Sequence, residues 1–181
     1  RKAHMNDVNQ HLAAGVANAI DDNTLACAAP FFAGRWEYAS LEKGAGFPNL
    51  AREGLPDEIA KKLDKPEAVE DAKNLSSKSF CEILRNALAH GGVLYLDQYG
   101  RSSFGDPVTC FAFISTNRQN NPTELNFLRV TMGDYRAFLQ SWIDWLKENS
   151  VEQVLADDLG VEPLGVGEPM VTDHAPAPAD V

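Results

Sequence analysis

The stretch that constrains the fold most is residues 66–89, where apolar residues recur with the spacing of one helix face. Pro66 suits the first turn of a helix, and the acids that follow it are favourable at the positive N-terminal end. Gly91 and Gly92 then supply a stop signal. The sequence therefore predicts one long amphipathic helix. Its apolar positions are Val69, Ala72, Leu75, Phe80, Ile83, Leu84, Ala87 and Leu88.

The pattern changes after Gly92, where three segments are rich in β-branched and aromatic residues. Stretches dominated by Gly, Pro, Asn and Ser separate these segments and have the composition of turns. Short strands joined by turns predict a three-stranded antiparallel β-meander at about residues 92–130. The expected strands are 93–96, 108–114 and 125–130.

Four further segments have the apolar spacing or the capping residues of helices. In the second of them, Phe32, Trp36 and Ser40 are spaced by four. Helical segments outweigh strands along the chain, so the sequence predicts an α+β fold that is mainly α. The expected helices are 6–20, about 30–43, a short one from 55 to about 63, and one from a Thr131 cap to about 149.

The length of 181 residues fits one domain with a sizeable core. We assign the domain to residues 6–150. Residues 1–5 are interpreted as a cloning remnant that ends at an initiator, Met5. Residues 151–181 combine acids with Gly, Pro and an Ala-Pro-Ala-Pro run, which predicts a largely flexible acidic tail.

The formal net charge of −10 argues against a nucleic-acid partner, because phosphate contacts need Lys and Arg. The charge is unevenly placed, however. Seven of the 26 acids fall in residues 151–181, which contain no Lys or Arg. The remaining 19 acids face 16 bases, so the body of the chain carries a net charge of only −3. A local basic site for RNA therefore stays compatible with the composition.

The cysteine and histidine pattern disfavours disulfides and metal sites. The chain has an odd number of cysteines, Cys27, Cys81 and Cys110, and no two of them have C-x-x-C spacing. The four histidines are scattered along the sequence. Glycine-rich stretches at 44–46 and 100–105 lack the context of nucleotide-binding loops, so no cofactor is expected. No apolar run approaches the roughly 20 residues of a spanning helix, and no leader opens the chain. These features predict a cytoplasmic protein without a membrane partner.

A polar strip on the predicted long helix is the main candidate site. Glu82, Asn86 and His90 are spaced by four, so they share one stripe of a helix, and Arg85 borders it. The flanking residues are apolar. His90 falls in the last turn, where the negative end of the helix dipole favours a cation. A solvated helix face is the alternative interpretation, because most charged stripes on amphipathic helices are of that kind.

The sequence from Arg85 to His90 resembles the Arg-x4–6-His motif of the HEPN superfamily, in which a polar residue, often Asn, follows the Arg. Asn86 occupies that position here. The order of an N-terminal helix pair, a long motif helix and a closing helix over residues 6–149 is also similar to a HEPN bundle. The meander resembles the embellishment of plasmid and defence-type HEPN-like proteins. The resemblance therefore implies a HEPN-like helical bundle with an inserted three-stranded meander.

The resemblance implies metal-independent RNA cleavage at a composite site between two copies of the chain. Arg85 and His90 of each copy would then share one cleft, with His90 as acid or base and Arg85 on the phosphate. Asn86 would orient His90 or bind a ribose or base edge. Glu82 would hold Arg85 or act on His90. Such a homodimeric ribonuclease fits a toxin or defence effector, with an antitoxin protein as a partner.

One departure from the family keeps a second function open. HEPN toxins paired with nucleotidyltransferase antitoxins often carry a Tyr two residues after the motif His, and this position is Gly92 here. The acidic composition also departs from that of a simple RNA-binding protein. The alternative is a non-catalytic HEPN-like dimer whose cleft binds a nucleotide, RNA or a protein partner.

A weaker candidate lies in the turn-rich segment 99–107. Tyr99 and Arg101 have side chains that can stack on bases or contact phosphate, which makes them candidate RNA contacts. The Gly and Pro content of the same segment favours a plain hairpin turn.

Overall fold

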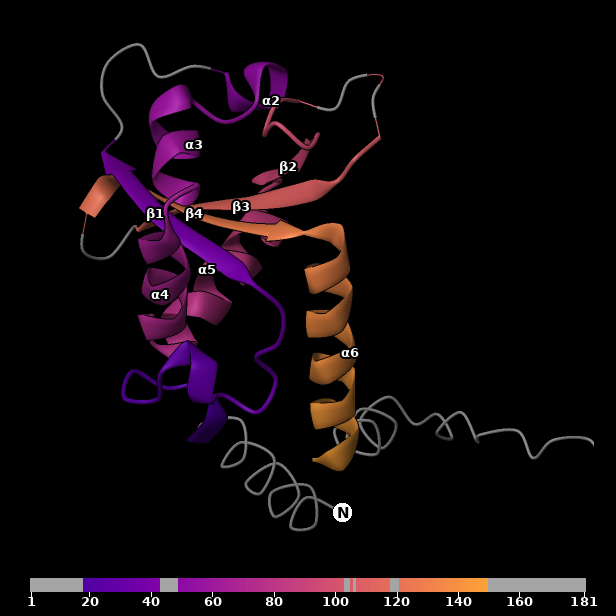
Figure 1. The fold of residues 1–181 in the computed structure, drawn as a ribbon. Helices are drawn as coiled ribbons and strands as arrows, with labels where there is room; N and C mark the ends of the chain where they lie inside the picture. Colours follow the sequence, from indigo (N-terminus) through magenta and orange to yellow (C-terminus); the bar gives the residue numbers. More distant parts are fainter. Residues whose placement is uncertain (1–17, 43–48, 103–104, 106, 118–120, 150–181) are drawn as a thin grey trace, which may run out of the picture.

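The computed structural model describes residues 18–42, 49–102, 105, 107–117 and 121–149 (Figure 1). Its centre is a four-stranded sheet in the order β1-β4-β3-β2, and all neighbouring strands are antiparallel. The first strand of the sheet along the chain therefore pairs with the last one. The strands are β1 (Trp36–Glu42), β2 (Val93–Leu96), β3 (Cys110–Asn117) and β4 (Asn121–Thr131).

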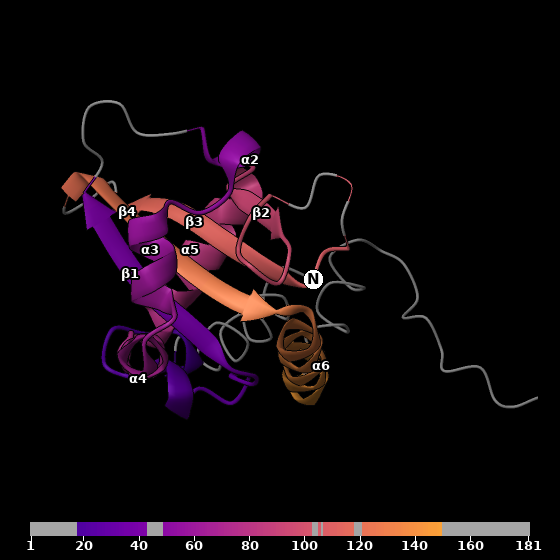
Figure 2. The same ribbon diagram turned by 45° about the horizontal axis from the view of Figure 1, so that its top comes forward.

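Helices cover both faces of this sheet (Figure 1). On one side lie α2 (Leu50–Glu53) and α3 (Asp57–Leu63). On the other lie α4 (Pro66–Asn74), α5 (Ser77–Ala89) and α6 (Met132–Glu148). A short 3-10 turn, η1 (Ala26–Ala28), precedes β1. Figure 2 shows α6 leaving the end of β4 on the side away from α3.

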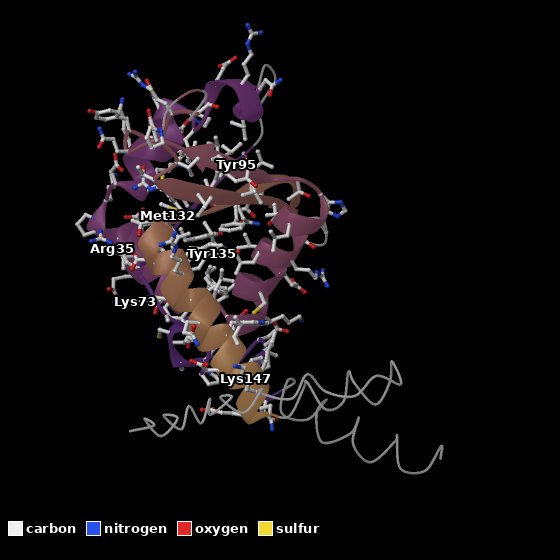
Figure 3. All side chains as sticks on the ribbon, turned by 90° about the vertical axis from the view of Figure 1, so that its right-hand side faces the viewer. Arg35, Lys73, Tyr95, Met132, Tyr135 and Lys147 are labelled. Atoms are coloured by element: carbon white, nitrogen blue, oxygen red, sulfur yellow. The ribbon has the colours of Figure 1, made fainter. Side chains whose placement is uncertain are left out.

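Because alternate strand residues point to opposite faces, the sheet has two cores. The core below α5 and α6 is aromatic: the ring centroid of Trp36 lies 5.0 Å from that of Phe80 and 5.3 Å from that of Phe138. Tyr135 lies between α6 and the sheet (Figure 3), with its ring 5.4 Å from that of Phe111. The core below α3 contains the buried residues Ala39, Ile59, Leu63, Leu94, Leu96, Ala112 and Phe127.

The predicted fold class is wrong. The chain is not a mainly α, HEPN-like helical bundle with an inserted three-stranded meander, because a four-stranded antiparallel sheet forms its centre. The three predicted strands themselves are confirmed as β2, β3 and β4, and β3 and β4 extend beyond their expected bounds. The fourth strand, β1, occupies the second half of the segment 30–43, which was predicted to be a helix.

The spacing of residues 36–42 explains this error. Trp36 and Ser40 have the i, i+4 relation of a helix, but Trp36 and Ala39 are buried on opposite faces of a sheet. The strand is held by seven registered pairs with β4, from Trp36 opposite Val130 to Glu42 opposite Glu124. Because this partner lies far along the chain, local periodicity does not reveal it.

The predicted helix at 66–89 is two helices, α4 and α5, with a break at Leu75 and Ser76. Leu75 is extended, and the Ser76 hydroxyl accepts a hydrogen bond from the Ser79 amide at 3.1 Å, which caps α5. The preceding segment holds the break open, because the Ala26 amide donates to the Leu75 carbonyl at 2.7 Å. The prediction is therefore right at both ends of the stretch and wrong in its middle.

The other expected helices have different outcomes. The short helix ending near residue 63 is confirmed as α3. The last helix is confirmed as α6, whose cap, the Thr131 hydroxyl, accepts a hydrogen bond from the Asp134 amide at 3.1 Å. Of the helix predicted at 6–20, only the final residues are described, and Asn18 and Ala19 are helical. The proposed remnant 1–5 and the tail 151–181 lie outside the described residues.

Candidate functional site

A cavity of about 800 Å³ lies between α5 and the sheet face that α5 covers. The polar residues of its α5 wall are Lys78, Ser79, Glu82, Arg85, Asn86 and His90. The polar residues of its sheet wall are Tyr38, Ser115, Thr116, Glu124 and Asn126, from β1, β3 and β4. The four residues of the predicted polar strip, Glu82, Arg85, Asn86 and His90, are thus brought to one cavity.

Helical periodicity places the polar strip on this wall. Phe80, Ile83, Leu84 and Ala87 are buried in the core below α5. The residues between them point away from the core, so the strip at 78, 82, 86 and 90 runs along one edge of the packed face. The apolar face of α5 therefore decides which side chains reach the cavity.

Arg85 is exposed, and its closest polar contact is the neighbouring amide. Its Nη2 and Nε donate to Asn86 Oδ1 at 3.1 and 3.4 Å. Among the described residues, no carboxylate oxygen lies within 4.0 Å of this guanidinium, so Glu82 does not hold Arg85 through an ion pair, which was one of its two expected roles. The amide of Asn86 holds Arg85 rather than His90. Arg85 therefore presents its remaining donors to solvent and the cavity.

Two glycines fix the end of the α5 wall. Gly91 has a φ of 69°, the left-handed conformation that ends a helix, and this confirms the predicted stop. Gly92 packs so closely on β3 that a Cβ would overlap the Ile114 carbonyl. The Gly92 carbonyl accepts a hydrogen bond from the Ile114 amide at 2.7 Å. The joint between α5 and the sheet thus sets the position of His90, the residue that ends the helix.

The sheet wall contains polar groups that the sequence analysis did not single out. Tyr38 Oη donates a hydrogen bond to Asn126 Oδ1 at 2.8 Å, which links β1 to β4. Ser115 lies opposite Asn126 in the register of β3 and β4, and both residues are buried. A weak signal for them was present: Ser115 and Asn126 are polar residues at inward-facing positions of otherwise apolar strands.

The environment of Tyr38 keeps its hydroxyl protonated. Burial raises the pKa of the phenol above its ordinary value of 10.0, and the negative charge of Glu124 raises it further. A side-chain hydrogen bond from Ser40 acts in the opposite direction. Tyr38 therefore remains a hydrogen-bond donor to Asn126 at neutral pH.

The cavity carries charges of both signs. Lys78 forms an ion pair with Asp22 at 2.7 Å, and the hydrogen bond to Asp22 raises the pKa of this lysine. Glu82 and Glu124 are the other acids of the lining. The guanidinium of Arg85 is thus the cation of the lining that has no carboxylate contact among the described residues. An anionic group would be attracted to that end of the cavity.

Cys81, which precedes Glu82 on α5, is a partly buried free thiol. Burial and the nearby charge of Glu82 raise its pKa from 9.0 to about 12. The thiolate, the nucleophilic form of cysteine, is therefore scarce at neutral pH. Nucleophilic catalysis by Cys81 is not supported.

The structure does not bring Tyr99 and Arg101 into the cavity. The Asp97 carboxylate accepts hydrogen bonds from the amides of Tyr99 at 2.8 Å and Arg101 at 2.9 Å, which closes a tight turn. Neither residue lines the cavity, and the Tyr99 side chain is 73% exposed. The plain turn is therefore the better interpretation of this segment.

Within the described parts of the chain, no group of three or more His, Cys, Asp or Glu side chains could hold a metal ion. No helix among the described residues is both long enough and apolar enough to cross a membrane. Comparisons with models of protein families, with curated proteins and with solved structures find no match to this chain. The resemblance of the Arg85–His90 segment to the HEPN motif therefore stays a prediction.

Proposed function

We propose that the chain is a metal-independent endoribonuclease whose RNA site is the cavity along α5. The observation that carries the proposal is that Arg85, Asn86 and His90 line one cavity of about 800 Å³ while Asn86 holds the exposed guanidinium of Arg85. These are the residue types that cleavage through the ribose 2′-hydroxyl needs. A phosphodiester in this cavity would meet a cation and an imidazole on the same wall.

Each residue has a defined role in such a reaction. His90 transfers a proton to or from a ribose or leaving-group oxygen, because an imidazole can act as a general acid or a general base. Arg85 donates to the phosphoryl oxygens and remains charged. Asn86 positions Arg85 through its Oδ1. Glu82 lies on the same wall and balances the charge of the cavity.

Cleavage requires both a base for the 2′-hydroxyl and an acid for the leaving oxygen. Among the described residues that line the cavity, His90 is the single histidine. We therefore assign the second proton-transfer group to His90 of another copy, in a homodimer whose two α5 walls face one another. Such a nuclease acts in the cytoplasm, which suits three cysteines that are all free. A toxin or defence role, controlled by an antitoxin protein, follows from cleavage of cellular RNA.

The test is a cleavage assay with labelled RNA and the full chain, with and without EDTA. Arg85→Ala and His90→Ala should each lower the rate by about 100-fold or more. Arg136→Ala is the matched control, because Arg136 is exposed on α6 and does not line the cavity. EDTA should have no effect. Full activity in both cavity variants, or loss of activity in EDTA, would contradict the proposal.

A second function is favoured by the acids of the cavity. Asp22, Glu82 and Glu124 line the same space as Arg85 and His90, and Asp22 already neutralises Lys78. A cavity in which acids offset the cations suits a non-catalytic module that binds a nucleotide, an RNA or a protein partner. Binding of labelled RNA over a wide concentration range without cleavage products would favour this module over the nuclease.

A further inference from the structure

The two walls of the cavity differ in the kind of ligand group that they can bind. The α5 wall offers the exposed guanidinium of Arg85 and the imidazole of His90, together with the carboxylate of Glu82. The described residues of the sheet wall include no cation; they offer the Tyr38 phenol, the Asn126 amide and the Glu124 carboxylate. A ligand that fills both walls therefore has an anionic end and a neutral end with several hydrogen-bonding groups. Nucleotides have this composition.

Hydrogen bonding within the sheet wall fixes what Asn126 can offer. Its Oδ1 accepts the Tyr38 hydroxyl at 2.8 Å, so the amide is oriented by a neighbour that stays protonated. The Nδ2 group carries two donors, and neither is used in the bond to Tyr38. Asn126 therefore presents donors to a ligand acceptor.

Glu124 supplies the complementary acceptors. It lies two residues from Asn126 on β4, so both side chains project from the same face of the sheet, roughly 7 Å apart along the strand. Glu124 lines the same cavity as Tyr38 and Asn126. An ionised carboxylate accepts two parallel hydrogen bonds from adjacent donors. The sheet wall thus offers one donor group followed by two acceptors.

We propose that the sheet wall binds the Watson–Crick edge of a guanine base, with Asn126 Nδ2 donating to O6 and Glu124 accepting from N1–H and the 2-amino group. This inference rests on the proposed function, since it names the base that the RNA cleft reads. Guanine is the base that presents one acceptor beside two adjacent donors. Adenine and cytosine present a single amino donor beside a ring-nitrogen acceptor, and uracil presents one donor between two acceptors.

The arrangement of strands connects this base site to the phosphate end. Gly92, next to the end of α5, accepts a backbone hydrogen bond from Ile114, which precedes Ser115 on β3. Ser115 lies opposite Asn126 on β4, and Tyr38 lies beyond them on β1. The base site on β4 therefore lies one strand spacing, about 5 Å, from Ser115 on β3, the strand that Gly92 contacts. A nucleotide can place its phosphate near Arg85 and its base on Asn126 and Glu124.

Calorimetric titration of the full chain with the 5′-monophosphates of guanosine, inosine, adenosine, cytidine and uridine tests the proposal. Guanosine monophosphate should bind about tenfold more tightly than the adenosine, cytidine and uridine nucleotides. Inosine monophosphate keeps O6 and N1–H but lacks the 2-amino group, so its affinity should lie between that of guanosine monophosphate and those of the other three nucleotides. A short guanine-containing RNA that binds more tightly than guanosine monophosphate identifies RNA as the source of the base, and the reverse identifies the free nucleotide.

Glu124→Gln should weaken the binding of guanosine monophosphate about tenfold and leave the binding of adenosine monophosphate unchanged. Glu42→Gln is the matched control, because Glu42 lies opposite Glu124 on β1, is exposed and does not line the cavity. Equal binding of all bases, no binding of any nucleotide, or equal effects of the two substitutions would each overturn the proposal.

The outcome is separable from that of the proposed ribonuclease activity. Cleavage of RNA at sites without a guanine preference leaves the nuclease intact and overturns the guanine site. Selective binding of guanosine monophosphate by a protein that does not cleave RNA supports the guanine site and overturns the nuclease.

Discussion

The two walls of the cavity are built in different ways. The α5 wall takes its groups from one helix and its C-cap and leaves Arg85 and His90 exposed. The sheet wall takes Tyr38, Ser115 and Asn126 from three strands and ties two of them together with a hydrogen bond. Within the part of the chain that the structure describes, Arg85 and His90 on the first wall make no contact that holds the sheet together. The side chains on the second wall are fixed, because the same contacts also hold the sheet.

This difference separates two kinds of consequence. A change on the α5 wall alters chemistry and leaves folding nearly untouched, whereas a change on the sheet wall alters recognition and folding together. The joint between the walls, where Gly92 packs on Ile114, affects both the cavity and the fold. Stability measurements therefore test the comparison directly, and they do so without any knowledge of the ligand.

The largest effect is expected at the joint. Gly92→Ala would place a Cβ against the Ile114 carbonyl, and backbone atoms have little room to yield. We expect a loss of about 3 kcal/mol in the free energy of unfolding, measured by urea denaturation. Gly133→Ala on α6 is the control, because its Cβ meets only the Thr131 hydroxyl at 3.9 Å and Ala favours a helix. Equal stability of the two variants would show that the walls are not joined at Gly92.

A smaller loss is expected within the sheet wall. Asn126→Ala removes the acceptor of the Tyr38 hydroxyl in a partly buried setting, and we expect a loss of about 2 kcal/mol in the free energy of unfolding. Tyr38→Phe removes the same bond from the other side and should cost about 1 kcal/mol. The double variant should cost less than the sum of the two. Additive losses would show that the bond between β1 and β4 contributes nothing to stability.

The same contrast explains what the sequence could predict. The α5 wall is local: the i, i+4 spacing of Glu82, Asn86 and His90 and the glycine stop are all contained in one segment. Helical periodicity was therefore enough to predict that these side chains share one wall. Whether they perform the predicted chemistry is a separate question that spacing does not address.

The sheet wall is non-local, and it could not be predicted in the same way. Asn126 faces the cavity because β4 pairs with β3 on one side and with β1 on the other, and Tyr38 reaches it only through that second pairing. With β1 interpreted as a helix, Tyr38 had no reason to lie near Asn126. The break in the long helix was missed for a similar reason, because residues distant in the sequence stabilise it. The Thr24 carbonyl accepts a hydrogen bond from the Ser77 amide, and the Ala26 amide donates one to the Leu75 carbonyl.

Alkaline pH should destabilise the protein through Cys81 on α5 and Tyr38 on the sheet wall. The pKa of Cys81 is raised from 9.0 to about 12 in the folded chain, so the unfolded thiol releases its proton first. The stability that this group contributes is present below pH 9 and is lost as the pH rises toward 12. At pH 10 the loss is about 1 kcal/mol. Tyr38, whose pKa is also raised, adds to the loss at higher pH.

The check is a series of denaturation curves from pH 7 to pH 11. Cys81→Ser has no titrating group in this range, so its free energy of unfolding should fall less steeply with pH than that of the parent chain. Parallel slopes for the two proteins would show that Cys81 is not protected by burial. Because the comparison is between slopes, any constant cost of the substitution cancels.

The smallest effect is expected on the α5 wall. Arg85→Ala removes an exposed guanidinium whose contact is the adjacent Asn86 side chain, and alanine is at least as good a helix former as arginine. His90→Ala likewise removes an exposed side chain at the C-cap. Each substitution should change the free energy of unfolding by less than about 0.5 kcal/mol in urea denaturation. A loss of about 2 kcal/mol or more in either would mean that the α5 wall supports the fold as the sheet wall does. A fall in RNA cleavage could then no longer be assigned to chemistry at Arg85 or His90, whereas intact stability with lost cleavage would assign it there.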